Sequence, residues 1–337
     1  MQRESEGNGD KELKPLSRRE FMRRMSQATA SAGLATAGLA GIGVLTLHQK
    51  AEAAELVADR VGKLERMKLG TRMGAMEVSR VLISTDWNRD LYAPALALGA
   101  NFVHKAGYWK SMPAEFQGLP RDSYYTDLTV DSTPNNPDNE DQAYQQVVTA
   151  LDRTGLKYFD IFRAHFGWHS VDAFKNQTGT YKAFQRLKRE GKVKYFGVSQ
   201  HSHPENYPAY PEIIQAEIDS GIIDSMQVWM SATTTPDVIE VFAKAHKAGI
   251  GMTAMKTVAH GLGKVRGDAD IRQQMGAPDM PGRACVRYSL SATSPISGKG
   301  PIFHCCVLSL FNLENFEENV GAATVKTAAM DGFIHNV

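Results

Sequence analysis

Residues 156–165 read LKYFDIFRAH, and residues 183–199 read AFQRLKREGKVKYFGVS. Each stretch contains a short apolar run of the length and composition that are typical of a buried strand. The segment 180–190 lies between the two runs, is amphipathic, and is followed by Gly191, a residue type that commonly ends helices. A strand, a helix and a second strand in this order predict a βαβ unit with parallel strands.

The same alternation continues in both directions along the chain. Residues 68–84 predict a hairpin and a first strand, and the Pro-rich and Asn-rich residues 118–139 predict a third strand with a long loop. Further strands are expected at 101–103, 158–162, 193–198, 225–228, 252–255 and 302–308, and helices at 91–98, 140–155, 180–190, 212–220, 235–247, 285–290 and 315–328. About eight strand–helix pairs predict a (β/α)8 TIM barrel. An open doubly wound sheet is disfavoured because no G-x-G-x-x-G motif follows the first strand.

Composition narrows the class of protein. The chain has 337 residues, 42% of them hydrophobic, with 38 Lys and Arg against 37 Asp and Glu. This length can bury one large barrel or two ordinary domains, and the near-zero net charge argues against a nucleic-acid partner. The three cysteines, Cys285, Cys305 and Cys306, are too few for a disulfide framework. Adjacent strand residues point to opposite faces, so we expect no bond between Cys305 and Cys306.

The N-terminal segment has the features of an export signal. Residues 17–22 read SRREFM, with twin arginines at Arg18 and Arg19, and an uncharged Ala-rich and Gly-rich stretch follows at 25–49. Residues 51–53 (AEA) have the small-x-small pattern of a cleavage site. A membrane-spanning helix is the alternative, but Ala and Gly contribute little to membrane insertion.

These features divide the chain into an export signal at 1–53, a linker at 54–65, a barrel at 66–330 and a C-terminal tail at 331–337. The predicted partner of the signal is the twin-arginine translocation machinery, which exports proteins already folded. We therefore expect a periplasmic or exported protein, which contacts the membrane only through this signal, including as a tether if the signal is not cleaved.

The two quoted stretches resemble the aldo–keto reductase family, and residues 224–227 (DSMQ) and 314–320 (ENFEENV) extend the resemblance. It runs from about residue 66 to residue 328, which is nearly the whole chain after the signal. The resemblance implies an NAD(P)-dependent oxidoreductase that transfers a hydride to or from a small carbonyl or alcohol substrate.

In that family a Tyr protonates the substrate oxygen, a Lys lowers the pKa of the Tyr, an Asp pairs with the Lys, and a His orients the substrate. The resemblance implies that His165 is this His. The Asp position holds His104, the Tyr position falls on Trp109 with Tyr108 one residue earlier, and the Lys position holds Thr129. The catalytic set is therefore incomplete.

The catalytic residues that this comparison implies are His165, Tyr108 and Lys105, with the Lys105 ammonium replacing the missing cation beside Tyr108. Lys105 directly follows His104. Because successive strand residues point to opposite faces, we do not expect both side chains to act in one site.

The cofactor residues are also carried over from the resemblance. Ser199 and Gln227 match the residues that hold the nicotinamide amide, and Met255 stands where an aromatic ring is common. The phosphate-binding turn at 308–311 reads LSLF and lacks the usual cation, so the cofactor is NADP or NAD. The residues assigned to the cofactor are Ser199, Gln200, Gln227, Lys256, Glu318 and Asn319.

Two other functions stay open. The incomplete catalytic set is also compatible with a barrel that binds a ligand without catalysis. Several histidines follow predicted strands and would gather at one rim, where His201 and His203 with His165 or His169 could hold a metal ion. Their spacing matches no strong metal motif, so no metal ligand is assigned.

Overall fold

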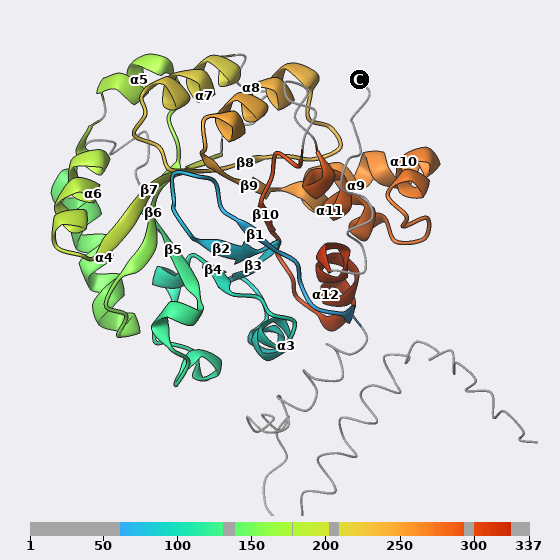
Figure 1. Cartoon of the computed structure of the whole chain (residues 1–337), viewed down its shortest axis with the longest axis horizontal. Coiled ribbons are helices and arrows are strands. Elements are labelled where there is room, and N and C mark those ends of the chain that lie inside the picture. Colours follow the sequence, from blue (N-terminus) through green and yellow to red (C-terminus); the bar gives the residue numbers. More distant parts are fainter. Residues whose placement is uncertain (1–60, 131–138, 177, 202–208, 293–299, 325–337) are drawn as a thin grey trace, which may run out of the picture.

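Eight parallel strands close into a barrel in the order β10-β3-β4-β5-β6-β7-β8-β9 (Figure 1). The computed structural model describes residues 61–130, 139–176, 178–201, 209–292 and 300–324. The barrel strands are β3 (Val81–Ser84), β4 (Phe102–His104), β5 (Tyr125–Val130), β6 (Phe159–Phe166), β7 (Val193–Gln200), β8 (Ser225–Trp229), β9 (Gly251–Met255) and β10 (Cys305–Val307). The predicted (β/α)8 barrel is confirmed.

The helices lie around the outside of the strands (Figure 1). The α-helices are α3 (Tyr92–Ala97), α4 (Glu140–Thr154), α5 (Val171–Asn176), α6 (Gly179–Arg189), α7 (Tyr210–Asp219), α8 (Pro236–Lys247), α9 (Thr257–Gly267), α10 (Ala269–Gln274), α11 (Pro281–Ser291) and α12 (Leu313–Val320). The 3-10 helices are η1 (Arg89–Leu91), η2 (Ala106–Tyr108), η3 (Ala114–Phe116), η4 (Arg121–Ser123) and η6 (Gly321–Ala323). The connection after β9 carries two helices, α9 and α10, before α11 packs beside the barrel.

Helix α4 shows how the local sequence produces these elements. The Asn139 side chain caps its first turn by accepting a hydrogen bond from the Gln142 backbone N–H at 2.9 Å. Gly155 ends it in the left-handed conformation, with φ of 69°. Its buried side chains recur at helical spacing: Ala143, Val147, Ala150, Leu151 and Thr154. This stripe packs the helix against the strands.

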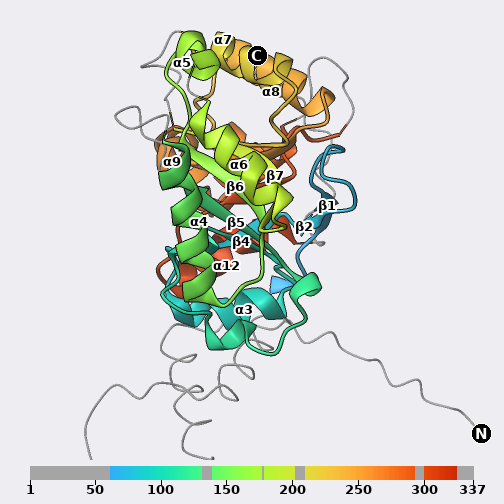
Figure 2. The same cartoon turned by 90° about the vertical axis from the view of Figure 1, so that its left-hand side faces the viewer.

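The amino-terminal hairpin closes one end of the barrel (Figure 2). Strands β1 (Arg66–Lys68) and β2 (Glu77–Ser79) pair antiparallel, as the sequence predicts. Apolar side chains of the hairpin form one buried cluster with inward-pointing strand residues: Leu69, Met73, Met76, Val78, Leu82, Phe102, Ile161 and Cys305. Only the opposite end, where the strands end, is therefore left for a site.

A second and larger core lies between the strands and the helices. Phe162 of β6 and Phe196 of β7 stack with ring centroids 5.9 Å apart, and Phe184 of α6 lies 5.1 Å from Phe196. Because the strands bury side chains on both faces, they read as nearly continuous apolar runs. The two cores also separate the adjacent cysteines, with Cys305 inside the barrel and Cys306 under the helices. All three cysteines are free, as expected.

Some boundaries differ from the predictions. Strand β6 continues to Phe166, since its polar residues Arg163 and His165 are still buried, whereas β10 is shorter than the expected 302–308. Helix α12 ends at Val320, and residues 325–328 of the expected helix lie outside the described residues. The predicted export signal (1–53), most of the linker (54–60) and the tail (331–337) also lie outside them. No helix of the described residues is long and apolar enough to span a membrane.

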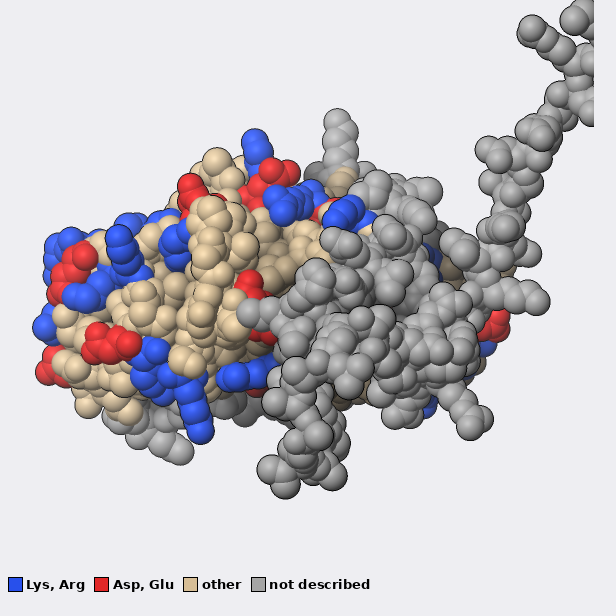
Figure 3. Space-filling model, turned by 90° about the horizontal axis from the view of Figure 1, so that it is seen from below, with Lys and Arg blue, Asp and Glu red and all other residues tan. Residues whose placement is uncertain are grey.

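The described part of one face carries basic and acidic side chains side by side (Figure 3). Exposed ion pairs in the described residues include Arg186 with Asp141 at 3.3 Å and Lys244 with Glu240 at 3.0 Å. Exposed pairs of this kind typically contribute less than about 1 kcal/mol. The stability of the fold therefore depends mainly on its buried apolar clusters.

Candidate active site

A cavity of about 980 Å³ opens where the barrel strands end. Its wall includes Gln227 of β8 and the last residues of four other strands: Ser84, His104, Met255 and Val307. The starts of α9, α11 and α12 complete the wall, with Thr257, Gly282 and Glu314 among the lining residues. This is the end of the barrel where sites occur in proteins of this fold.

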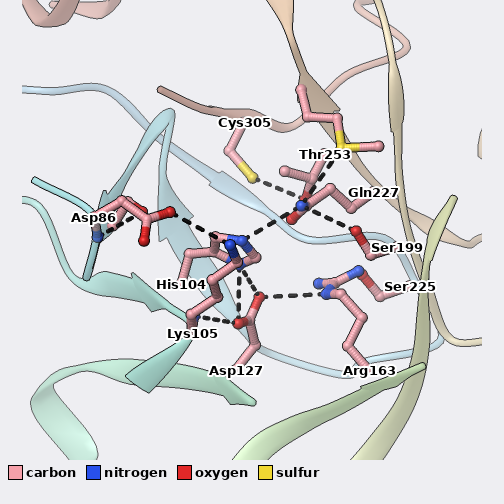
Figure 4. A network of polar contacts seen from close by, with 12 residues as sticks. Asp86, His104, Lys105, Asp127, Arg163, Ser199, Ser225, Gln227, Thr253 and Cys305 are labelled. Carbon is pink, nitrogen blue, oxygen red and sulfur yellow. Dashed lines mark hydrogen bonds and ion pairs between the residues drawn. The ribbon is translucent and has the colours of Figure 1, made fainter. Parts of the chain in front are cut away.

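A buried network of charged groups lies beneath the cavity (Figure 4). His104 Nδ1 lies 3.0 and 2.9 Å from the two carboxylate oxygens of Asp127, and the Lys105 backbone N–H donates to Asp127 Oδ1 at 2.7 Å. Arg163 Nε donates to Asp127 Oδ2 at 3.3 Å. His104, Asp127 and Arg163 come from β4, β5 and β6, so neighbouring strands bring them together.

The surroundings of Arg163 and Asp127 hold both in their charged forms. The Arg163 guanidinium also donates to the Val198 carbonyl at 3.1 Å and to Ser225 Oγ at 3.3 Å. Gly197 makes room for it, because a Cβ there would lie 3.3 Å from Arg163 Nη1. Burial alone would raise the pKa of Asp127, but His104, Arg163 and their hydrogen bonds outweigh burial and lower it to about 2.

Lys105 and Lys256 share an unusual backbone conformation. They have φ of 58° and 61° and are the non-glycine residues with positive φ in the described chain. Each directly follows a barrel strand, and both line the cavity. A non-glycine residue in this region typically costs about 1–3 kcal/mol, and such strain clusters at functional sites.

The turn at Lys105 overturns one expectation. His104 and Lys105 were expected to point to opposite faces, and this is wrong because the strand ends at His104 and the left-handed turn carries Lys105 onto the same cavity wall. The Lys105 ammonium lies 3.3 Å from Asp86 Oδ2, and 5.6 Å from the centre of the Tyr108 ring. The expected cation beside Tyr108 is thus present.

The tyrosine itself lies away from the cavity. Tyr108 ends η2, its side chain is 48% exposed, and it is not among the cavity-lining residues. Thr129, at the position of the family's Lys, is buried, and its hydroxyl has no hydrogen-bond partner. The catalytic roles of Tyr108 and Lys105 stay predictions.

His165 lies beside His201, with ring centroids 4.8 Å apart in an edge-to-face arrangement. His165 lies in β6, whereas His201 directly follows the adjacent strand β7 and lines the cavity. Burial, with His165, Lys256 and Lys105 nearby, lowers the pKa of His201 to about 3, so its ring is neutral near pH 7. The described residues contain no group of three metal-ligating side chains, and His203 lies outside them.

Ser199 and Gln227, which are expected to bind the nicotinamide, are in contact with each other. Gln227 Nε2 donates to Ser199 Oγ at 3.3 Å and lies 3.4 Å from His104 Nε2 and 3.7 Å from Met255 Sδ (Figure 4). Gln227 Oε1 is buried and has no hydrogen-bond partner among the described residues. A buried amide oxygen without a partner is costly, and a ligand in the cavity can supply the missing donor.

Gln200, the third such residue, is placed elsewhere. Strand alternation turns Ser199 into the barrel and Gln200 outward, where its amide donates to the Trp168 carbonyl at 3.2 Å and to Glu217 Oε1 at 3.1 Å. It does not line the cavity. We therefore withdraw Gln200 from the cofactor residues.

Lys256, Glu318 and Asn319 all line the cavity. Glu318 Oε1 accepts hydrogen bonds from the backbone N–H groups of Gly282 at 2.8 Å and Arg283 at 3.4 Å. Within the part of the chain that the structure describes, Asn319 Oδ1 is buried without a hydrogen-bond partner, and a Cβ at residue 282 would lie 2.5 Å from it. Gly282 thus keeps this acceptor accessible.

Sequence reasoning did not assign Asp127 and Arg163 to the site, and it noted His104 only as a departure from the family pattern. The sequence does contain a feature that could have identified them, because Asp127 and Arg163 each interrupt an apolar strand. Charged residues are rarely fully buried without partners, so such positions indicate a buried polar contact. Spacing alone could not show that these residues meet.

The model of the Aldo/keto reductase family matches residues 73–326 of this chain. Among curated proteins, none shows significant sequence similarity to it.

Solved structures of the same fold include an aldo-keto reductase from Bacillus halodurans in its holo form. It is 16% identical, with a TM-score of 0.57, over 81% of this chain and 98% of that one. An aldo-keto reductase from a Medee basin deep-sea metagenome library is 17% identical, with a TM-score of 0.55, over 80% and 93% of the two chains. At such identities the similarity shows the fold alone.

Proposed function

Because this chain belongs to the aldo/keto reductase family, we propose that it is an NAD(P)-dependent oxidoreductase that interconverts a small carbonyl compound and its alcohol. One observation carries the proposal. A single cavity is lined by Gln227 at the centre of the barrel and by Glu318 and Asn319 beside α11. The family resemblance assigns these residues to the two ends of the cofactor.

The wall fits such a cofactor. Gln227 Oε1 and Asn319 Oδ1 are buried acceptors without partners, which suit the amide hydrogens of nicotinamide and the amino group of adenine. Lys256 and Arg266 also line the cavity, and their charges suit a diphosphate. When bound, the cofactor supplies or removes the hydride. Lys105, His104 and His201 surround the space that is left for the substrate.

We propose that NAD(H) is bound in preference to NADP(H). Residues 308–311 contain no cation, and Glu314, Glu317 and Glu318 line the same end of the cavity. The side chain of Arg283 lies there too, but its Nε and Nη2 donate to the carbonyls of Glu318 and Glu317 at 3.2 Å each. The carboxylates disfavour the extra negative charge of a 2′-phosphate.

Fluorescence titration of the purified protein with NADH and NADPH tests this function. We expect NADH to bind about tenfold more tightly, a difference of about 1.4 kcal/mol. Gln227→Leu should weaken both cofactors, whereas Lys244→Met, an exposed change on α8, should affect neither. Absence of binding at high micromolar concentration of both cofactors overturns the proposal, and tighter binding of NADPH overturns only the preference.

Turnover is tested on a panel of aldehydes, ketones and quinones with the bound cofactor. Reduction of at least one class is expected. Cofactor binding without any turnover would favour a barrel that binds ligands without catalysis. Stoichiometric metal in untagged protein, measured by elemental analysis, would favour a metal-dependent enzyme instead.

We also propose that residues 1–53 direct the folded protein through the twin-arginine translocation machinery to the periplasm or beyond. Arg18, Arg19 and the uncharged stretch that follows support the proposal. A reporter fused after residue 53 should be exported, and replacing both arginines by lysine should retain it in the cytoplasm. Unchanged export of the double variant would contradict the proposal.

A further inference from the structure

The family's proton donor, a tyrosine, has no counterpart on the cavity wall, because Tyr108 is exposed and does not line the cavity. The Asp and Lys that act with this tyrosine in the family are replaced here by a carboxylate and a cation at other positions. A carboxylate (Asp127) and a cation (Arg163) form an ion pair with side chains that are entirely inaccessible to solvent, at 3.3 Å. Both lie beneath the cavity rather than on its wall, and His104 connects them to it.

We propose that His104 is the acid–base catalyst of this site and that Asp127 and Arg163 position it. This inference rests on the proposed function. In the reducing direction the substrate carbonyl gains a proton from His104 Nε2 at oxygen and a hydride from a reduced nicotinamide at carbon. A C–H bond and an O–H bond form, the imidazolium becomes neutral imidazole, and oxidation of the alcohol reverses each transfer.

The hydrogen bonds favour the neutral tautomer that this chemistry needs. The Asp127 carboxylate only accepts hydrogen bonds, so the proton of neutral His104 lies on Nδ1 and points to it. Nε2 then carries its lone pair on the cavity side, where the Gln227 amide donates to it at 3.4 Å. A carboxylate that orients a histidine in this way holds it ready to accept a proton from a substrate hydroxyl.

Several charged groups face His104 and influence its protonation. Asp127, on β5, favours the imidazolium, and Arg163, on β6, opposes it. At the cavity wall, Lys105 and Lys256 also oppose it, while Asp86 offsets Lys105 through their 3.3 Å contact. His201 lines the same cavity as His104. Arginine does not lose its proton in proteins, so the Asp127–Arg163 pair keeps a constant charge while His104 exchanges its proton.

The other titratable groups near the cavity fit the role less well. His201 lines the cavity, but its pKa near 3 leaves it neutral and a poor proton donor around pH 7. Lys105 is engaged by Asp86. Tyr108 is about half exposed and does not line the cavity. Of these groups, His104 is the one that both lines the cavity and contacts the buried Asp127 carboxylate.

The first experiment compares His104→Asn with the wild type under steady-state conditions, on whichever member of the substrate panel the wild type reduces. Asparagine keeps an N–H donor near the position of Nδ1 but exchanges no proton. We expect kcat to fall by about 10²- to 10⁴-fold, while the Kd for NADH changes less than about twofold. The pH profile of kcat should lose the ionisation that the wild type shows for a histidine acid–base group.

Two variants serve as comparisons. His246→Gln changes a histidine on α8, outside the cavity, and should keep the wild-type kcat and pH profile. Tyr108→Phe distinguishes the two acids, because a comparable loss of kcat in Tyr108→Phe with little loss in His104→Asn would overturn our assignment in favour of the tyrosine.

The second experiment observes the His104 ring directly by ¹⁵N NMR of histidine-labelled protein without substrate, and its deciding measurement is made on the wild type. We expect the neutral wild-type ring to carry its proton on Nδ1, and Asp127→Asn to shift the proton to Nε2. A wild-type ring with its proton on Nε2 would overturn the proposal.

These experiments distinguish failure of the proposed oxidoreductase function from failure of the His104 assignment. If neither NADH nor NADPH binds, or the wild type reduces no member of the panel, the proposed function fails and the inference fails with it. If the wild type binds and reduces but His104→Asn keeps its kcat and pH profile, only the assignment of His104 fails.

Discussion

Replacing Asp127 by asparagine removes the carboxylate from a buried ion pair while keeping the shape of the side chain. Its folded-state pKa is about 2, against 3.8 in the unfolded chain, a difference of about two pH units. At about 1.4 kcal/mol per unit, the lowered pKa corresponds to roughly 2–3 kcal/mol of stability near neutral pH. The variant also leaves the Arg163 cation buried without its carboxylate, so we expect a total loss of about 3–5 kcal/mol.

Urea denaturation at a series of pH values measures this loss. Because the folded pKa lies below the unfolded one, the stabilisation is complete above about pH 4 and disappears as the pH falls towards 2. The difference between the wild type and Asp127→Asn should therefore shrink over that range. A double variant with Arg163→Met should lose less than the sum of the two single variants, since neither charge is then left alone. A loss below about 1 kcal/mol at pH 7, or additive losses, would refute the reasoning.

Further predictions concern three buried positions. Burial raises the pKa of Glu217 from 4.5 to about 8, so the fold favours its neutral form and loses stability as the pH rises through that range. Glu217→Gln should remove this loss and gain about 2–4 kcal/mol at pH 8, measured as a rise in Tm that is absent at pH 4. Gly107→Ala should destabilise by about 1–3 kcal/mol in urea denaturation, because a Cβ there would lie 1.9 Å from Leu128 Cδ1. Burial raises the pKa of the Cys305 thiol to about 12, so it should not react with a thiol reagent at pH 8 until the protein unfolds.

The barrel could be predicted because its signals are local. Apolar runs such as 193–198, helices that end at glycines such as Gly155 and Gly191, and their strict alternation need only near neighbours in the chain. Boundaries were less accurate where polar residues continue a strand, as in β6, whose Arg163 and His165 are buried by the barrel itself. Burial depends on the other strands, so the sequence of β6 does not reveal it.

The candidate site was predicted only in part, for a related physical reason. Gln227, Glu318 and Asn319 were expected from the family resemblance, and together with Lys256 they line one cavity. Gln200 was misplaced because strand alternation turns it outward to Glu217. A matching motif predicts which residue type stands at a position. The direction of the side chain depends on how the strand lies in the barrel.

The sequence by itself determined the class of fold, the place of the site at the strand ends, and the departure from the family's catalytic residues. Only the tertiary structure decided which charged side chains meet beside the cavity. His104, Asp127 and Arg163 are separated by 23 and 36 residues along the chain, and they meet because closure of the barrel sets β4, β5 and β6 side by side. The left-handed turn at Lys105 is equally a product of that packing, since local sequence does not favour it in a lysine. Pairing between distant strands is a property of the closed barrel, and no local pattern encodes it.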